Sequence, residues 1–137
     1  MVSVTPLWDR GGVKPLRIAG FDGTVVMVWP VDGWESTTVE VITPDGTQTL
    51  HLRPFSRPDL AGLRDVMAAA VLEDRVGDAL VDDALLSLAV EEVDGDRLIV
   101  SISAVLDDER DFMRMFPTSR LAVWNLAMDV GAQIGEA

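Results

Sequence analysis

The segment Thr37–Arg53, with the sequence TTVEVITPDGTQTLHLR, decides the fold class. Apolar and polar residues alternate on both sides of an Asp45-Gly46 turn, which is typical of two antiparallel strands with one buried face. A two-residue loop at this turn would place Val41 opposite Leu50. We therefore predict a hairpin whose valines and leucines face one core.

Two further strands are expected upstream of this hairpin. Residues 14–20 and the β-branched run 24–29 are separated by Asp22-Gly23, and Asp-Gly between two such runs is a strong hairpin signal. Residues 14–53 are thus predicted to form a four-stranded antiparallel meander.

A helix is predicted from about residue 57 to residue 76. Ser56 has the properties of an N-cap, Asp59 stands at the capping-box position, and Gly77 would end the helix. The apolar residues that recur at helical spacing are Leu60, Leu63, Met67, Ala70 and Val71.

A second hairpin is expected within residues 86–104, where the alternation returns. A three-residue loop, or an equivalent bulge, would pair Val90 with Val100 and Leu88 with Ile102. A two-residue Asp-Gly loop would instead put the two apolar sets on opposite faces, so we predict the longer loop or the bulge.

The last part of the chain is predicted to be helical. Residues 107–115 would form a short helical piece that ends before Pro117, and Thr118 or Ser119 would cap a final helix. The expected apolar face of that helix contains Leu121, Val123, Trp124, Ala127, Met128, Val130, Gly131 and Ile134.

Together these elements predict the order ββββ-α-ββ-α. The class is α+β, with a mainly antiparallel sheet of about six strands and two amphipathic helices packed on one face. Residues 1–13 would be a flexible N-terminal arm and residues 14–137 a single domain, with no internal repeat beyond the Asp-Gly turns. The polar positions expected on the uncovered sheet face are Thr38, Glu40, Thr49, His51, Ser87, Glu91, Ser101 and Ser103.

Charge and composition narrow the class of protein. The 137 residues have a formal net charge of −12. Residues 1–57 contain five basic and six acidic residues, whereas residues 58–137 contain six arginines and seventeen acidic residues. Such acidity excludes nucleic-acid binding through phosphate neutralisation. Ten arginines beside a single lysine, in a sequence rich in Ala, Val, Asp and Gly, are typical of a high-GC bacterium or its phage.

Targeting signals and cysteines are also informative. No apolar run approaches the roughly 18 residues of a membrane span, and the N-terminus has no signal-peptide pattern. The absence of cysteine excludes disulfides and zinc-thiolate sites. We therefore expect a cytoplasmic domain that does not contact a membrane.

Catalytic motifs are missing from the sequence. His51 is the only histidine, and there is no phosphate-binding loop, nucleophile elbow or dinucleotide fingerprint. The carboxylate clusters at residues 82–83, 91–96 and 107–111 do not have calcium-loop spacing and are interpreted as solvated or capping charges. We predict no catalytic residue, no cofactor and no metal site.

Partner-binding residues are predicted from charge crowding and from tryptophans outside the expected core. Antiparallel geometry would bring the two acids at 82–83 close to those after residue 106, and Trp29 and Trp124 are expected in the core. Phe112 to Phe116 would form either a binding surface or a flap over the core. The partner-binding candidates are Trp8, Trp34, Asp82, Asp83, Asp107, Asp108 and Asp111.

Three functions remain open. The first is a non-enzymatic domain that neutralises or escorts a basic protein; in size, charge and element order alone, it resembles bacterial immunity proteins and secretion chaperones. The second is an assembly component of a phage or other multi-subunit particle, in which the arm would exchange between subunits of a homo-oligomer. The third, least favoured, is an enzyme that uses carboxylates and a divalent metal.

Overall fold

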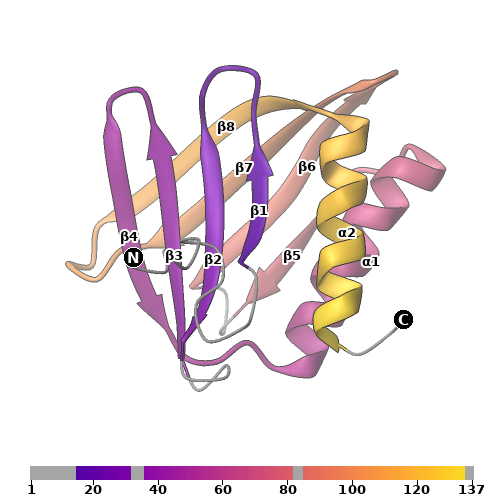
Figure 1. Ribbon diagram of the computed structural model, residues 1–137. Coiled ribbons are helices and arrows are strands. Elements are labelled where there is room, and N and C mark those ends of the chain that lie inside the picture. Colours follow the sequence, from indigo (N-terminus) through magenta and orange to yellow (C-terminus); the bar gives the residue numbers. More distant parts are fainter. Residues whose placement is uncertain (1–14, 32–35, 82–84, 135–137) are drawn as a thin grey trace, which may run out of the picture.

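The computed structural model describes residues 15–31, 36–81 and 85–134, and in them the unit ββββα occurs twice (Figure 1). The first unit comprises β1 (Leu16–Ala19), β2 (Val25–Val31), β3 (Ser36–Thr43), β4 (Gly46–Leu52) and α1 (Arg57–Glu73). The second comprises β5 (Gly77–Val81), β6 (Leu86–Asp94), β7 (Arg97–Val105), β8 (Asp111–Ser119) and α2 (Arg120–Ile134).

The first sheet has the predicted meander order β1-β2-β3-β4. Its last hairpin differs in register from the prediction, because Pro44 and Asp45 form the turn and Gly46 is already in β4. Val39 therefore lies opposite Leu50, not Val41. The slip amounts to two residues, so the same side chains still face the core.

The second sheet, β5-β6-β7-β8, has two strands that the sequence did not reveal. The predicted pairs Val90–Val100 and Leu88–Ile102 are confirmed, and a bulge at Glu91 provides the required register shift. β5 was missed because it has only five residues, directly after the helix. The helix itself ends earlier than predicted, at Glu73, with Asp74 in the left-handed conformation.

The predicted helical piece at residues 107–115 is wrong, because strand β8 begins at Asp111. Period-2 alternation explains the strand: Phe116 and Thr118 are buried, whereas Met113 and Met115 are exposed. Pro117 is compatible with β8 because this strand lies at the edge of its sheet, where one side needs no ladder hydrogen bond.

The α+β class with antiparallel sheets is therefore confirmed, but one six-stranded sheet is wrong. The two four-stranded sheets and both helices share one buried cluster, with Leu63, Met67, Ile102 and Phe116 among its largest side chains. In Figure 1 the two sheets lie one in front of the other and the helices lie together at one side. Helix α1 contacts β5 of the second unit, and α2 contacts β1 of the first.

The order ββββα occurs in both units, so the fold repeats an arrangement that the sequence did not reveal as an internal repeat. Rows of residues that lie opposite one another on neighbouring strands can be matched between the sheets. The row Leu16, Val28, Val39 and Leu50 of the first sheet matches the row Gly77, Val90, Val100 and Phe116 of the second. Three buried positions of the helices match at one spacing, Leu60 with Val123, Leu63 with Leu126, and Met67 with Val130, whereas Ala70 would match Gln133, which is not buried.

The sheets meet where β1 ends. The Phe21 amide donates a hydrogen bond to the Pro117 carbonyl at 2.8 Å, and the Thr118 hydroxyl donates one to the Ala19 carbonyl at 2.7 Å. A Cβ atom on Gly20 would lie 2.7 Å from the Phe116 ring, so only glycine allows this approach.

The predicted apolar face of α2 is confirmed at Val123, Ala127, Val130, Gly131 and Ile134, but the buried face is rotated toward Leu126. Leu126 is buried, whereas Leu121 and Met128, both assigned to the apolar face, are exposed, and Trp124 is only partly buried. The capping prediction is confirmed for Ser119, whose hydroxyl accepts a hydrogen bond from the Ala122 amide at 3.0 Å. In α1 the Ser56–Asp59 capping box is also confirmed.

Two leucines of α2 test this rotation. Leu126→Ala should reduce the free energy of unfolding by about 2–5 kcal/mol, because it leaves a cavity in the core. Leu121→Ala, on the same helix, should change it by less than about 0.5 kcal/mol. Urea denaturation measures both; equal losses would show that this face assignment is wrong.

Reciprocal arginines join the two helices. Arg120, the first residue of α2, donates hydrogen bonds to the Val71 carbonyl in the last turn of α1, to Asp74 at 2.7 Å and to the Gly95 carbonyl at 2.7 Å. Arg57, the first residue of α1, donates to the Ile134 carbonyl at the end of α2. Each helix C-terminus therefore receives a positive charge and a donor from the other helix.

Removal of the Arg120 guanidinium should be costly. Arg120→Ala should reduce the free energy of unfolding by about 1.5–3 kcal/mol, because carbonyls from two elements lose a charged donor. Arg75→Ala provides a matched control, since the side chain of Arg75 is 68% exposed and pairs with Glu73; it should cost less than about 0.5 kcal/mol. A loss as small at Arg120 as at Arg75 would contradict the capping role.

Candidate functional site

The outer face of the second sheet, which points away from the core, contains the candidate site. Large apolar residues of β6 and β7 point inward, and the alternate positions carry small residues. Ala89 and Ser101 are only 8% and 4% exposed, so they lie at the bottom of a depression. We call this depression the trough; its floor consists of Ser87, Ala89, Ser101 and Ser103.

Larger apolar side chains stand on the strands at both sides of the floor. Leu80 on β5 is opposite Ser87, and Met113 on β8 is opposite Ser103. Leu80, Met113 and Met115 are 57%, 63% and 46% exposed. These three residues form the rims of the trough. Exposed apolar side chains on both sides of a small-residue floor are typical of a surface that receives another apolar group.

Hollows run along the whole outer face. One of about 370 Å³ lies over β5 to β7, and a second of about 310 Å³ extends to Met113. They share Ser87 and Ser103 in their lining, so they form one continuous depression. A third, of about 260 Å³, lies further along β6 and β7 beside Asp94 and Arg97.

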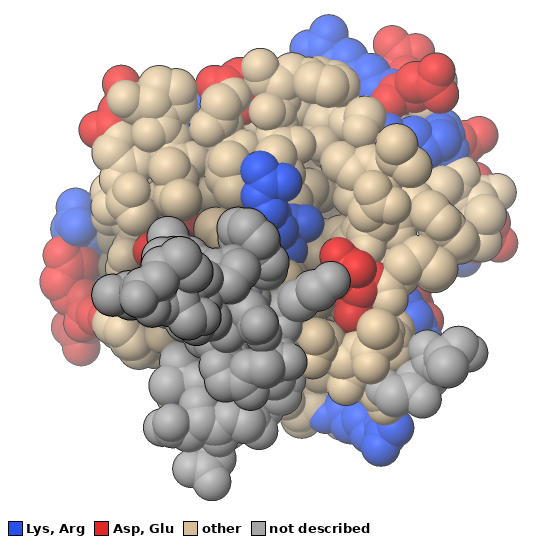
Figure 2. All heavy atoms as spheres, in the orientation of Figure 1, with Lys and Arg blue, Asp and Glu red and all other residues tan. Residues whose placement is uncertain are grey.

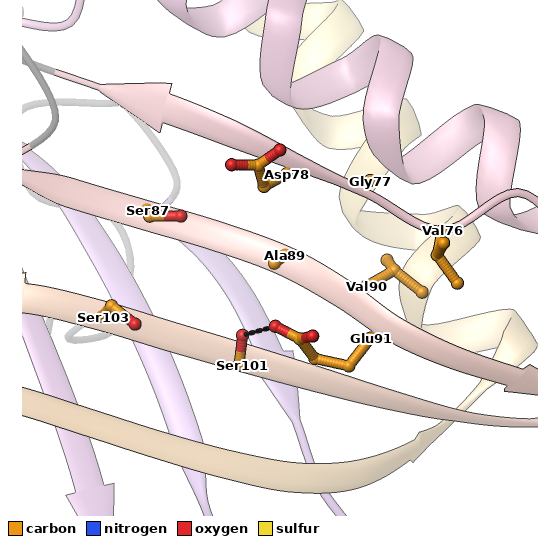
Figure 3. A pocket seen from close by; sticks show the side chains of 9 residues that line it. All are labelled: Val76, Gly77, Asp78, Ser87, Ala89, Val90, Glu91, Ser101 and Ser103. Carbon is orange, nitrogen blue, oxygen red and sulfur yellow. Dashed lines mark hydrogen bonds between the residues drawn. The ribbon is translucent and has the colours of Figure 1, made fainter.

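The bulge in β6 provides the acidic end of the trough. The extra residue, Glu91, lies on the outer face, where its carboxylate accepts a hydrogen bond from the Ser101 hydroxyl at 2.8 Å (Figure 3). Asp78 lines the same hollow from β5 (Figure 3). Since a bulge redirects side chains without ending the pairing, it brings a carboxylate to the floor while β6 continues.

Negative charge dominates this outer face among the described residues. It carries one arginine, Arg97, against the acidic residues Asp78, Glu91, Glu92, Asp94 and Asp111. The view from the opposite side, where the first sheet lies, shows both acidic and basic side chains (Figure 2). The acidity of residues 58–137 is therefore partly collected on one surface.

The predicted partner-binding residues are only partly placed. Trp8, Trp34, Asp82 and Asp83 lie outside the described residues, so the expected crowding of four carboxylates is not tested. The other three, Asp107, Asp108 and Asp111, lie at the turn between β7 and β8. Asp111 lines the trough. Asp107 pairs with His51, and Asp108 pairs with Arg110.

His51 and Asp107 connect the two sheets. The Asp107 carboxylate accepts a hydrogen bond from the His51 backbone amide at 3.2 Å and lies 2.8 Å from the His51 ring Nδ1. Because β4 is an edge strand, its outward amides could pair with a strand of another chain. The Asp107 carboxylate accepts the hydrogen bond of one of these amides, that of His51. The His51 ring, followed by its amide, lowers the pKa of Asp107 below the ordinary 3.8.

Two other carboxylates have lowered pKa values. The Arg110 side chain lowers the pKa of the exposed Asp108. Desolvation alone would raise the pKa of Asp22, but hydrogen bonds from Thr24 and the charge of Arg114 outweigh it, so the value is lowered. Arg114 thereby ties β8 to the β1–β2 turn, at 3.1 Å from both Asp22 and the Thr24 hydroxyl.

The sequence identified part of this site. The outward orientation of Ser87, Glu91 and the two serines of β7 was predicted, but with residues of the other sheet on the same face, which is wrong because there are two sheets. The methionine rim was missed because β8 was assigned as a helix. The alternation of Phe112 to Phe116 is the signal that could have revealed it, since it splits the cluster into buried phenylalanine and exposed methionines.

Other classes of site find little support in the described residues. No group of three or more His, Asp or Glu side chains there is arranged to hold a metal ion. Neither of the two described helices is both long and apolar enough to cross a membrane. No protein-family model and no curated protein matches the chain.

The His51–Asp107 pair predicts a pH-dependent stability. Because folding lowers the pKa of Asp107, its contribution is fully present above the unfolded value of 3.8 and is lost as the pH falls through the folded value. The stability difference between wild type and Asp107→Ala should therefore be larger near neutral pH than in strong acid. Urea denaturation at several pH values measures it.

His51→Ala provides the matched background for this experiment. In that background the pH dependence caused by Asp107→Ala should become weaker, because the largest cause of the lowered pKa is gone. An equal difference at every pH in the wild-type background would refute the pairing.

Proposed function

We propose that this protein is a cytoplasmic, non-enzymatic domain that binds a basic protein partner and neutralises or escorts it. The observation that carries the proposal is the outer face of the second sheet, which combines exposed Leu80, Met113 and Met115 with five carboxylates and one arginine. Exposed apolar area supplies affinity, and surrounding acids attract a basic surface.

The chemistry of the trough favours binding over catalysis. Its polar groups are serine hydroxyls and carboxylates, without a histidine or lysine that could activate a hydroxyl. The only histidine is held by Asp107 at the edge of the first sheet. Glu91 is already bonded to Ser101, which orients its carboxylate toward the floor.

Two variants with equal charge change test the proposal. The first neutralises the outer face with Glu91→Gln, Glu92→Gln, Asp94→Asn and Asp111→Asn. The control neutralises four exposed acids elsewhere with Asp45→Asn, Asp65→Asn, Glu73→Gln and Asp129→Asn. Each set removes four negative charges from the formal net charge of −12.

Affinity capture from the native host, with identification of the bound protein and measurement of its association rate, is the experiment. We expect a basic partner whose association slows by about tenfold or more in the outer-face variant and at high salt, but little in the control. Equal slowing in both variants would show that only net charge matters. High-order assembly in light scattering, without a bound partner, would favour the particle component instead.

A further inference from the structure

The two sheets of this protein provide an internal comparison, because their outer faces correspond position by position. In the first sheet, two rows of paired residues face outward. One row consists of Arg17, Met27, Glu40 and Thr49, and the other consists of Ala19, Val25, Ile42 and Thr47. In the second sheet, the row that corresponds to the first consists of Asp78, Ala89, Ser101 and Met115. The row that corresponds to the second consists of Leu80, Ser87, Ser103 and Met113.

Most differences between these rows act in one direction; the exception is Asp78, which is shorter than the corresponding Arg17. On the two central strands of the second sheet, alanine or serine stands where the first sheet has methionine, glutamate, valine or isoleucine. On the outermost strand, methionine replaces both threonines, and Leu80 stands where the first sheet has Ala19. The floor is thereby lowered and most of the rim is raised, which distinguishes the outer face of the second sheet from that of the first among the described residues.

We infer that the trough binds an amphipathic α-helix of the partner, with its apolar stripe against the rim side chains and basic residues near the bulge. This inference rests on the proposed function and names its recognition mode. Neighbouring strands lie about 4.8 Å apart, so β5 and β8 are separated by about 14 Å. A helix with its side chains is about 10–12 Å wide and fits between the rims.

Length and charge agree with this occupant. β6 and β7 have nine residues each, so their outer face is about 30 Å long; β5, which carries one rim, has five residues, so a helix would lie between both rims for about 16 Å, or about 11 residues. Glu91, Glu92 and Asp94 gather at the bulge end and Asp111 lies at the other. Lysines or arginines at the helix ends would meet these carboxylates, and the flexible methionines would adapt to its apolar stripe.

Other occupants fit less well. A strand laid on the sheet face would leave its backbone amides and carbonyls without partners, whereas a helix satisfies its own. A second copy of this chain would bring the same five carboxylates against each other, which like-charge repulsion opposes.

Synthetic peptides of about 18 residues test the inference. One has leucines at helical spacing and lysines on the other face, a second has the same composition in strict alternation, and a third has glutamate in place of lysine. Binding is measured by fluorescence anisotropy, and hydrogen exchange locates the contact. We expect the helical basic peptide to bind at least about tenfold more tightly than either other peptide, with protection at residues 87–89 and 101–103.

Two variants with matched exposure identify the surface. Met113→Ser with Met115→Ser removes side chains that are 63% and 46% exposed, and the control Leu121→Ser with Met128→Ser removes side chains of α2 that are 66% and 45% exposed. The rim variant should raise the Kd of the helical peptide by about tenfold or more, and the control by less than about twofold. Because all four positions are exposed, the melting temperature should hardly change.

The helix inference is overturned if the helical peptide does not bind, if the alternating peptide binds equally well, or if the α2 control weakens binding as much as the rim variant. Such a result leaves the basic-partner proposal standing when the neutralised outer face still slows association of the captured partner. Loss of that effect as well would overturn both.

Discussion

The structure depends on the mutual capping of its two helices. The last carbonyls of a helix have no partner within the helix, and here an arginine from the first turn of the other helix supplies one. Arg120 also bonds the turn between β6 and β7, so one guanidinium joins the end of α1, the start of α2 and the second sheet. This interaction requires an antiparallel helix pair, and that pair in turn brings α1 to β5 and α2 to β1.

The crossed arrangement explains which faces remain uncovered. Each helix contacts the first strand of the other unit, and the buried faces of both sheets contribute to one shared core. Both helices therefore pack against the shared core, and neither covers the outer face of a sheet. The protein thus has two outer sheet faces with the same inward–outward alternation of side chains. The trough differs from the corresponding surface of the first sheet only in the identity of its side chains.

Local sequence signals predicted those elements whose register or caps are determined by near neighbours. The Asp22-Gly23 hairpin, the Ser56–Asp59 box and the Val90–Val100 pairing all depend on contacts within a short segment. The division into two sheets and the rotation of α2 depend on contacts between distant segments, such as Thr118 with Ala19. Apolar residues surround much of α2, so its periodicity alone does not identify the buried side. The trough was missed for the same reason: its rim requires β8 to be a strand.

The two units differ in the side chains of their outer faces. Several positions that face the core are apolar in both, such as Val39 and Val100, or Val41 and Ile102. On the outer faces, where packing imposes no such demand, Arg17 corresponds to Asp78 and Glu40 to Ser101. A solubilising surface needs charge of either sign but neither a lowered floor nor raised methionine rims. The outer face of the second sheet differs from that of the first in its small central residues, its exposed methionines and its excess of acid, and these differences are the basis of the proposed binding surface.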